Sequence, residues 1–329
     1  MHKIPIIVSI ILLITTSCQE LLFDETPDNT NINNFELLWK IFDTRYCFFE
    51  EKHINWDSIH VAYRSRINNG LSSHDFFVQM ASMLGELKDG HVGLESNLDT
   101  FYYLGWKQHY PANYISNSLG SNNLSGMNWT KISNNTAYIK YPSFSNQIDD
   151  NVFENIFVQI KNCKGLIIDI RNNGGGNRVY AEAFVSKFIE SSKIVGYSKE
   201  KRGSGHNDFT DFSEIKIEPT TSNPYKGIIV ILTNRSVFSA ANLFVSEMKV
   251  LPNVITIGDQ TGGGGGIPIS SELLNGWRLK LSIDPLFNIH KESIEEGIPP
   301  DIAKSISKTD EKNGFDRILN YAIAYIEGM

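Results

Sequence analysis

Residues 165–177, GLIIDIRNNGGGN, join a continuous apolar run to a polar turn that contains three glycines. An uninterrupted apolar run ending at Asp169 is typical of a strand buried on both faces, as in a parallel sheet. Glycines directly after such a strand let backbone N–H groups face a ligand. The spacings GxGxxG and GxxxxGK[ST] are absent, so an oxyanion hole is the better functional interpretation, with a tight turn as the structural alternative.

Similar runs recur on both sides of this stretch and predict the fold class. Gly227–Leu232 (GIIVIL) is a second buried run, and residues 254–258 form a third, shorter one. Helical patterns lie between and around them, at 152–160, 180–189, 239–249 and 313–327, and alternating strand patterns lie at 136–141 and 276–283. Strands that alternate with helices indicate an α/β core with parallel pairing.

The region before this core has a different pattern. Residues 33–90 show three helical periodicities, and Ser72 with Ser73 provides an N-cap for the third. We therefore predict a small N-terminal helical subdomain at 33–90, followed by a catalytic domain at 91–329.

The first 18 residues, MHKIPIIVSIILLITTSC, are typical of a secretion signal. Lys3 is followed by an apolar stretch that is shorter than the roughly 20 residues needed to span a bilayer. The small residues before Cys18 resemble the lipobox of bacterial lipoproteins, which implies cleavage before Cys18 and lipid on its sulfur and amine; an ordinary signal with an incidental cysteine is the alternative. Residues 19–32 are polar and acidic and are expected to form a flexible tether. These features predict a lipid-anchored location in the cell envelope, on the periplasmic or the surface side of an outer membrane.

Composition and charge exclude one class of partner. The 329 residues are 41% hydrophobic and 20% charged, with a formal net charge of −7, as in ordinary globular proteins. No cluster of lysine and arginine is present to meet a phosphate backbone, so nucleic-acid binding is not expected. Cys47 and Cys163 lie in apolar patterns, and we expect two separate buried thiols rather than a disulfide.

Two residues have local sequences that are consistent with a catalytic role. His91, in LKDGHVGL, follows a glycine outside any apolar periodicity, where its ring can point into a cleft and take a proton near neutral pH. Ser239 follows the second apolar run and opens a helical pattern. A serine there is commonly an N-cap, and less often a nucleophile assisted by the amides of the helix start.

Five motifs in order resemble the C-terminal-processing, or tail-specific, peptidases and their tricorn-core branch. They are Asp89-Gly90-His91, Asp169 to Gly175 (DIRNNGG), Ser239-Ala240, Gly258 to Gly263 (GDQTGG) and Gly297 to Asp301 (GIPPD). The resemblance covers roughly residues 35–305. It implies an α/β fold with a ClpP/crotonase-like core and a serine peptidase activity that needs no metal or organic cofactor.

The resemblance also implies roles for single residues. Ser239 matches the nucleophile, Gly175, or Gly174 as the close alternative, matches an oxyanion glycine, and the Ala240 amide would be the second donor.

The predicted general base differs from that of the processing proteases. Their lysine would stand at Gly264, and no lysine occurs in 250–279. The tricorn branch uses a histidine instead, matched by His91, with an acidic residue that orients it, matched by Glu295 or next by Glu296. The serine of that branch before its histidine is replaced by Gly90.

A second departure concerns substrate capture. Only about 40 residues separate Leu94 from Thr136, too few for the PDZ domain that the family usually carries, so capture by a PDZ groove is not expected. The overall prediction is a serine peptidase acting on a peptide or protein. An esterase using the same site and an inactive peptide-binding lipoprotein are the alternatives.

Overall fold

The computed structural model describes residues 27–329 except 117–118, 120–121, 125, 148 and 222–223. The predicted signal peptide with Cys18 and most of the predicted tether lie outside the described residues, so the lipid anchor and the envelope location stay predictions. The C-terminal boundary of the tether, predicted at 32, was wrong, because a helix capped by Thr30 begins at Asn31. In the part of the chain that is described, no helix is long and apolar enough to cross a membrane.

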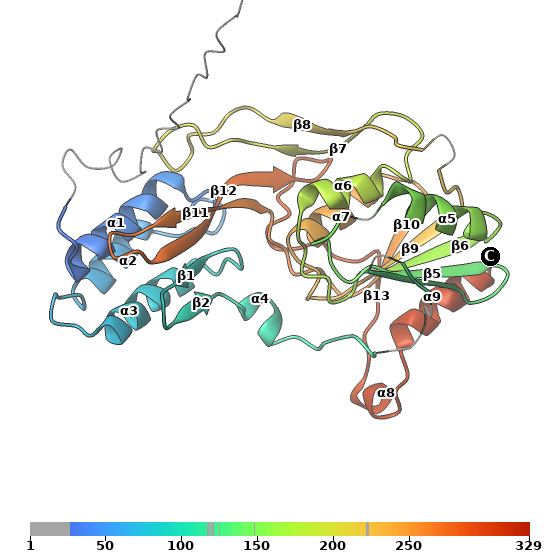
Figure 1. Ribbon diagram of the computed structural model, residues 1–329, viewed down its shortest axis with the longest axis horizontal. Helices are drawn as coiled ribbons and strands as arrows, with labels where there is room; N and C mark the ends of the chain where they lie inside the picture. The colour runs from blue at the N-terminus through green and yellow to red at the C-terminus, as the bar shows by residue number, and fades with distance from the viewer. Residues whose placement is uncertain (1–26, 117–118, 120–121, 125, 148, 222–223) are drawn as a thin grey trace, which may run out of the picture.

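The larger of two lobes is built on a sheet with the strand order β13-β10-β9-β6-β5-β4-β3 (Figure 1). The first five strands in that order pair in parallel, and β4 and β3 extend the sheet in antiparallel fashion. The strands are β3 (Asn122–Leu124), β4 (Met127–Lys131), β5 (Thr136–Lys140), β6 (Gly165–Asp169), β9 (Ile228–Thr233), β10 (Val254–Gly258) and β13 (Ile302–Ala303). The predicted α/β core with parallel pairing is confirmed.

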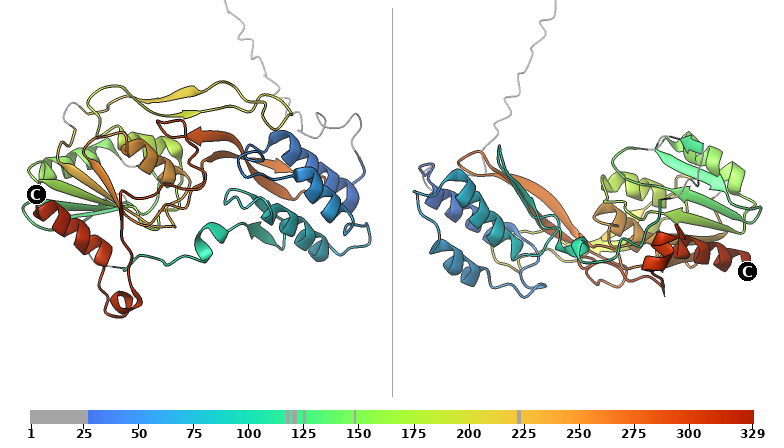
Figure 2. Two further views of the ribbon diagram at one scale, coloured as in Figure 1. Left: turned by 180° about the vertical axis from the view of Figure 1, so that it is seen from behind. Right: turned by 90° about the horizontal axis from the view of Figure 1, so that it is seen from below.

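Helices cover both faces of this sheet. One face is covered by α5 (Asp150–Ile160), α6 (Arg178–Val185) and α7 (Ala240–Met248), and the other by α9 (Arg317–Glu327) (Figures 1 and 2). Successive side chains of a strand point to opposite faces, so a continuous apolar run supplies two cores. Ile168 and Ile231 lie in the cluster that contains residues of α5, α6 and α7, whereas Ile167 and Val230 lie in the cluster that contains residues of α9.

The second lobe contains α1 (Asn31–Arg45), α2 (Trp56–Arg64) and α3 (Ser73–Gly85). The predicted cap of the third helix is confirmed, because the Ser72 side chain accepts a hydrogen bond from the Asp75 amide. These helices share one hydrophobic cluster with β1 (Gly93–Glu95) and β12 (Arg278–Phe287). The lobe therefore combines the helical segment predicted at 33–90 with strands from the catalytic segment.

Several extended segments join the lobes. Strand β12 pairs with β1 and with β11 (Gly266–Glu272) in the small lobe, and with β7 (Lys193–Ser198) near the core. The hairpin of β7 and β8 (Ser213–Ile217) runs along both lobes (Figures 1 and 2). From β2 (Thr100–Tyr102) the chain returns to the core through α4 (Gly105–Gln108), and α8 (Lys308–Lys312) precedes the last helix. The site described below lies where these connections meet the core.

A buried arginine ties the C-terminal helix to the strand that leads into the glycine turn. The Arg171 guanidinium donates hydrogen bonds to both carboxylate oxygens of Asp169, at the end of β6, and to both oxygens of Asp316. Asp316 also caps α9 by accepting from the Leu319 amide. All three side chains are buried or nearly so, and the positive charge of Arg171 neutralises the two carboxylates.

We expect Arg171→Met to lower the free energy of unfolding by about 3–5 kcal/mol, because it leaves two carboxylates buried without a cation. Urea titration followed by circular dichroism measures the change. Arg202→Met is the matched control, since Arg202 and its partner Glu200 are both mostly exposed; its effect should stay within about 0.5 kcal/mol. Equal effects of the two substitutions would contradict the role given to Arg171.

Candidate active site

The turn that carries Ser239 lies between two glycine-rich loops. Strands β6 and β9 are parallel neighbours, so their carboxyl ends place the loops that follow them side by side. The Phe238 amide donates to Asn173 O at 3.1 Å, and the Ser239 amide donates to Gly263 O at 2.9 Å. The first bond joins the turn to the loop after β6, and the second joins it to the loop after β10. Ser239 is thus fixed from both sides at the start of α7.

Ser239 has a backbone conformation that L-residues rarely adopt. Its φ is +57° and its ψ is −126°, and its side chain makes no capping hydrogen bond to the helix. An N-cap serine has a β-region backbone and accepts a bond from an amide of the first turn. The capping interpretation therefore does not describe this residue. Backbone strain of this kind costs about 1–3 kcal/mol and is concentrated at functional sites.

His91 lies directly opposite this serine. Its Nε2 atom is 2.8 Å from Ser239 Oγ, although the two residues are 148 positions apart in the chain. Asp89 holds the turn that presents the ring: its Oδ1 accepts the His91 amide at 2.7 Å, and its Oδ2 accepts the Ser282 hydroxyl of β12 at 2.9 Å. The structure thus brings together two of the predicted site residues at hydrogen-bond distance.

The environment of His91 keeps its ring neutral. Burial lowers the pKa of His91 to about 4; Asp89 acts against this shift and Lys280 adds to it. Between about pH 6.5 and pH 4 the unfolded chain binds a proton at this residue that the folded chain does not. The stability contributed by the neutral ring is therefore complete above pH 6.5 and is lost as the pH falls to 4. At neutral pH the ring is free to accept a proton.

The two predicted oxyanion glycines differ in position. A Cβ on Gly175, whose φ is +97°, would lie 2.9 Å from both Ser239 Cβ and Ala240 N, whereas a Cβ on Gly174 would meet nothing within 4 Å. Gly175 is therefore the glycine packed against the serine. Its amide donates to Asn173 Oδ1 at 2.9 Å. The Ala240 amide belongs to the first turn of α7, where no helical acceptor exists.

Glu295 and Glu296 lie beside a lysine rather than on the histidine. The Glu295 carboxylate accepts the Gly265 amide at 2.8 Å and lies 3.1 Å from Lys52 Nζ, which is equally close to Glu296. No described side chain hydrogen-bonds to His91 Nδ1; the Gly266 backbone interacts with the ring and raises the pKa of His91. Burial raises the pKa of Glu295, and the Lys52 ammonium opposes that shift. The structure therefore places the predicted orienting residues next to the site but not in contact with the ring.

Sequence reasoning missed three neighbours of the site. Asp89 belongs to the same three-residue motif as His91, and its position two residues before the histidine was the available signal. Lys52 lies far from the glycine loop in sequence, so no spacing pattern links them. Phe238 precedes the serine and packs on His91 with ring centroids 4.8 Å apart.

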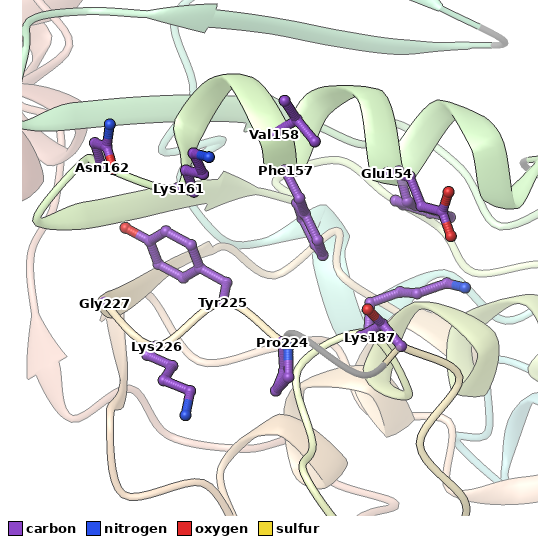
Figure 3. Close-up of a pocket in the computed structure, with 12 residues that line it drawn as sticks. Glu154, Phe157, Val158, Lys161, Asn162, Lys187, Pro224, Tyr225, Lys226 and Gly227 are labelled. Carbon is purple, nitrogen blue, oxygen red and sulfur yellow. The ribbon is translucent and has the colours of Figure 1, made fainter.

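Two pockets of the described residues lie outside the serine turn, and neither is lined by Ser239. One, of about 590 Å³, lies between α5 and the segment before β9, with Phe157 and Tyr225 at its centre (Figure 3). The other, of about 660 Å³, lies between the small lobe and α4, and Trp106 and Gly262 form part of its wall. Of these two pockets, only the second approaches His91, because its wall residue Trp106 stacks on Phe238, which contacts the histidine.

Two family models match parts of this chain. Residues 135–304 match the model of peptidase family S41, and residues 27–85 match that of the tricorn protease C1 domain. A solved structure of a candidate peptidase from Parabacteroides merdae is 38% identical, with a TM-score of 0.87, over 91% of this chain and 97% of that one.

Two curated relatives show more local similarity. The tail-specific protease of Haemophilus influenzae is 30% identical over 141 residues, which is 42% of this chain and 19% of that protein. The tricorn protease of Thermoplasma acidophilum is 29% identical over 193 residues, which is 57% of this chain and 16% of that protein. The chain spans less than a fifth of the length of these two relatives.

The resemblance to C-terminal-processing and tricorn-core peptidases, carried by five short motifs, is confirmed by these matches. The family model extends over a little more than half of the chain, and it includes the glycine turn after β6, the serine turn and the closing motif. The similarity to the Parabacteroides merdae structure extends over nearly the whole described fold. The chain belongs to peptidase family S41.

Proposed function

We propose that this chain is an active serine peptidase in which Ser239 is the nucleophile and His91 is the general base. The observation that carries the proposal is the 2.8 Å contact between His91 Nε2 and the hydroxyl of a serine held at positive φ. A strained serine whose side chain leaves its own helix uncapped is costly to maintain without a function. Its contact with a neutral histidine supplies that function, because such a ring can take the hydroxyl proton.

The reaction proceeds as acyl transfer. His91 Nε2 takes the proton of Ser239 as Oγ bonds to the carbonyl carbon of the scissile peptide. The negative charge forms on the carbonyl oxygen, which accepts a hydrogen bond from the Ala240 amide. His91 then gives its proton to the leaving nitrogen as the C–N bond breaks. A water molecule attacks the ester, losing a proton to His91, and Ser239 leaves with that proton.

The second oxyanion donor requires a change of partner. The Gly175 amide lies beside the serine but is engaged by Asn173 Oδ1. The substrate oxygen would take this amide over from the side chain, while Asn173 keeps its own bond to Tyr141 O at 3.0 Å. Each preorganised donor contributes on the order of 3 kcal/mol to the transition state.

The charge that develops on His91 faces an anion. Asp89 is fully buried, and its carboxylate raises the pKa of His91 against the effect of burial. We propose that Asp89 positions the ring through the backbone bond and stabilises the imidazolium. Glu295, predicted for that role, would act at longer range through the Gly265 amide and Lys52.

The test is covalent labelling with a fluorophosphonate at pH 7.5, followed by trypsin digestion and tandem mass spectrometry. Cleavage after Arg235 and Lys249 releases a peptide that contains Ser236, Ser239 and Ser246. We expect one adduct, on Ser239, and parallel loss of hydrolysis of an unfolded protein substrate. An adduct on Ser236 or Ser246, or no adduct at all, would refute the nucleophile. Labelling with hydrolysis of p-nitrophenyl acetate but of no peptide would favour the esterase alternative.

A further inference from the structure

Two stacked aromatic rings lie over His91. Trp106, on the short helix α4, stacks on Phe238 with ring centroids 4.3 Å apart and an interplanar angle of 17°. Phe238 in turn contacts the His91 ring. Phe238 is 8% exposed and His91 is 4% exposed, so the two outer rings separate the histidine from the surface.

Three glycines surround this pair and leave space for it. A Cβ on Gly90 would lie 2.6 Å from Trp106 Nε1 and 2.7 Å from Phe238 Cζ, and a Cβ on Gly264 would lie 2.6 Å from Phe238 Cζ. A Cβ on Gly262 would lie 2.4 Å from Trp106 Cε3. Real Cβ atoms do not approach other atoms this closely, so the rings and the glycines depend on each other.

In the motifs that this chain resembles, the tricorn branch has a serine at the position of Gly90, and the processing proteases have a lysine at the position of Gly264. The Phe238 ring lies next to both positions, so neither can take a larger side chain while the ring stays in place. The polar groups are thus replaced by apolar surface on the same side of the catalytic histidine. Such surface removes water and gives no hydrogen bond in return.

We propose that Trp106 and Phe238 form an aromatic cover that keeps water from His91, and that Trp106 is a positioning residue for the general base. The inference rests on the proposed function of His91. Trp106 also lines the pocket of about 660 Å³ between the lobes. Removing the indole would extend this pocket to Phe238, the ring that packs on His91.

Trp106→Ala keeps the charged groups near His91 in the sequence, and it also keeps the Gly266 backbone group that raises the pKa of His91. Asp89 lies in the same turn, Lys280 lies on β12, and the Lys52–Glu295 pair lies beyond Asp89. Burial is nevertheless the largest influence on the ring and lowers the pKa of His91 to about 4. Loss of the cover should therefore move this pKa upward, toward its ordinary value of about 6.5.

The experiment is a pH titration of the ¹⁵N-histidine-labelled full chain by NMR, with the His91 signals identified by their loss in His91→Gln. We expect Trp106→Ala to raise the pKa of His91 by at least about one unit. Trp106→Phe is the matched control and should leave it nearly unchanged, because it keeps a flat apolar ring. Phenylalanine also removes an indole N–H that has no acceptor among the described residues.

A second variant tests the cover without removing either ring. Gly90→Ala leaves both rings in the sequence but forces them outward, and it should shift the pKa in the same direction. This variant decides the question if Trp106→Ala does not fold, as judged by circular dichroism. An unchanged pKa in folded Trp106→Ala, or in Gly90→Ala in its place, would overturn the proposal.

Labelling by fluorophosphonate gives a kinetic readout. If the pKa of His91 returns to about 6.5, the neutral fraction at pH 5 falls on the order of 30-fold relative to the wild type, while labelling at pH 8 changes much less. The two proposals fail separately. A wild-type chain that never labels refutes the peptidase but leaves the NMR shift to be judged, and labelling with no shift refutes only the cover.

Discussion

Replacing Ser239 by alanine is expected to reduce peptide hydrolysis on the order of 10⁶-fold and to abolish fluorophosphonate labelling. The hydroxyl is the atom that forms the acyl bond, and no other described side chain is in hydrogen-bond contact with His91 Nε2. The remaining rate would come from binding and from the oxyanion donors alone. Hydrolysis of an unfolded protein substrate, followed by gel and by release of new amino termini, measures the loss.

Ser236 provides the matched control for this substitution. It lies in the same turn, three residues before Ser239, and its amide rather than its hydroxyl makes the local hydrogen bond, to Asn234 Oδ1. Ser236→Ala should retain hydrolysis within a few-fold of the wild type. Comparable losses in the two variants would show that the turn, and not the hydroxyl, is being disturbed, and activity that survives in Ser239→Ala would remove the nucleophile.

The strained backbone at Ser239 also predicts a difference in stability between variants that are equally inactive. Glycine adopts positive φ without steric cost. Ser239→Gly should therefore be as inactive as Ser239→Ala but more stable than it, by roughly 1 kcal/mol. Urea titration measures the difference.

The core of the fold was predictable because its signals are local. The apolar runs of β6 and β9 are buried on both faces, and a strand of this kind shows no polar interruption. The β7–β8 hairpin had no such signal: its residues are partly exposed, and a register shift between Ile194 and Gly196 interrupts the alternation. Strand β11 was not predicted for a similar reason, because it begins in the glycine run and its pairing with β12 has a register shift at Pro268.

Helix boundaries were less predictable than helix positions. The pattern at 180–189 predicted a helix that in the structure spans Arg178–Val185. The Asn177 side chain starts this helix by accepting the Val179 amide, two residues before the apolar pattern begins. Apolar periodicity continues past its end only because Phe188 and Ile189 belong to the same core.

The site was predictable in its residue types but not in its contacts. His91 and Ser239 stood out because each follows a turn that leaves its side chain outside the core pattern. The partner of Glu295 could not be found in the same way, because Lys52 comes from the small lobe, 243 positions away in the chain. A search for lysine near the glycine loop fails for that reason. The aromatic cover likewise joins α4 to the serine turn through a contact between distant segments.

Replacing His91 by glutamine is expected to reduce hydrolysis at pH 7 on the order of 10⁴- to 10⁶-fold, because the amide cannot take a proton from Ser239. Glutamine is close in size to histidine and keeps a polar end that can hydrogen-bond to the serine hydroxyl. The variant therefore separates proton transfer from simple positioning. His91→Ala removes both, and we expect the two variants to be equally inactive.

The pH dependence of the hydrolysis rate further distinguishes a loss of proton transfer from a loss of positioning. In the wild type the rate should depend on neutral His91 and fall only as the pH approaches its low pKa of about 4. The residual rate of His91→Gln should lack this titration. His74→Gln is the matched control, since His74 is mostly exposed and pairs with Asp99 on the small lobe. Its rate and pH profile should equal those of the wild type.

Lys52 is a nearby amine that could substitute as a base, and its chemistry argues against that role. Burial alone would lower the pKa of Lys52, but Glu295 and Asp89 outweigh it and hold the ammonium protonated. A protonated amine cannot accept the serine proton. If His91→Gln kept substantial activity and Lys52→Met abolished it in a folded chain, the base would have to be reassigned to the lysine. Loss of activity in His91→Gln with its pH dependence removed leaves the proton transfer with the histidine.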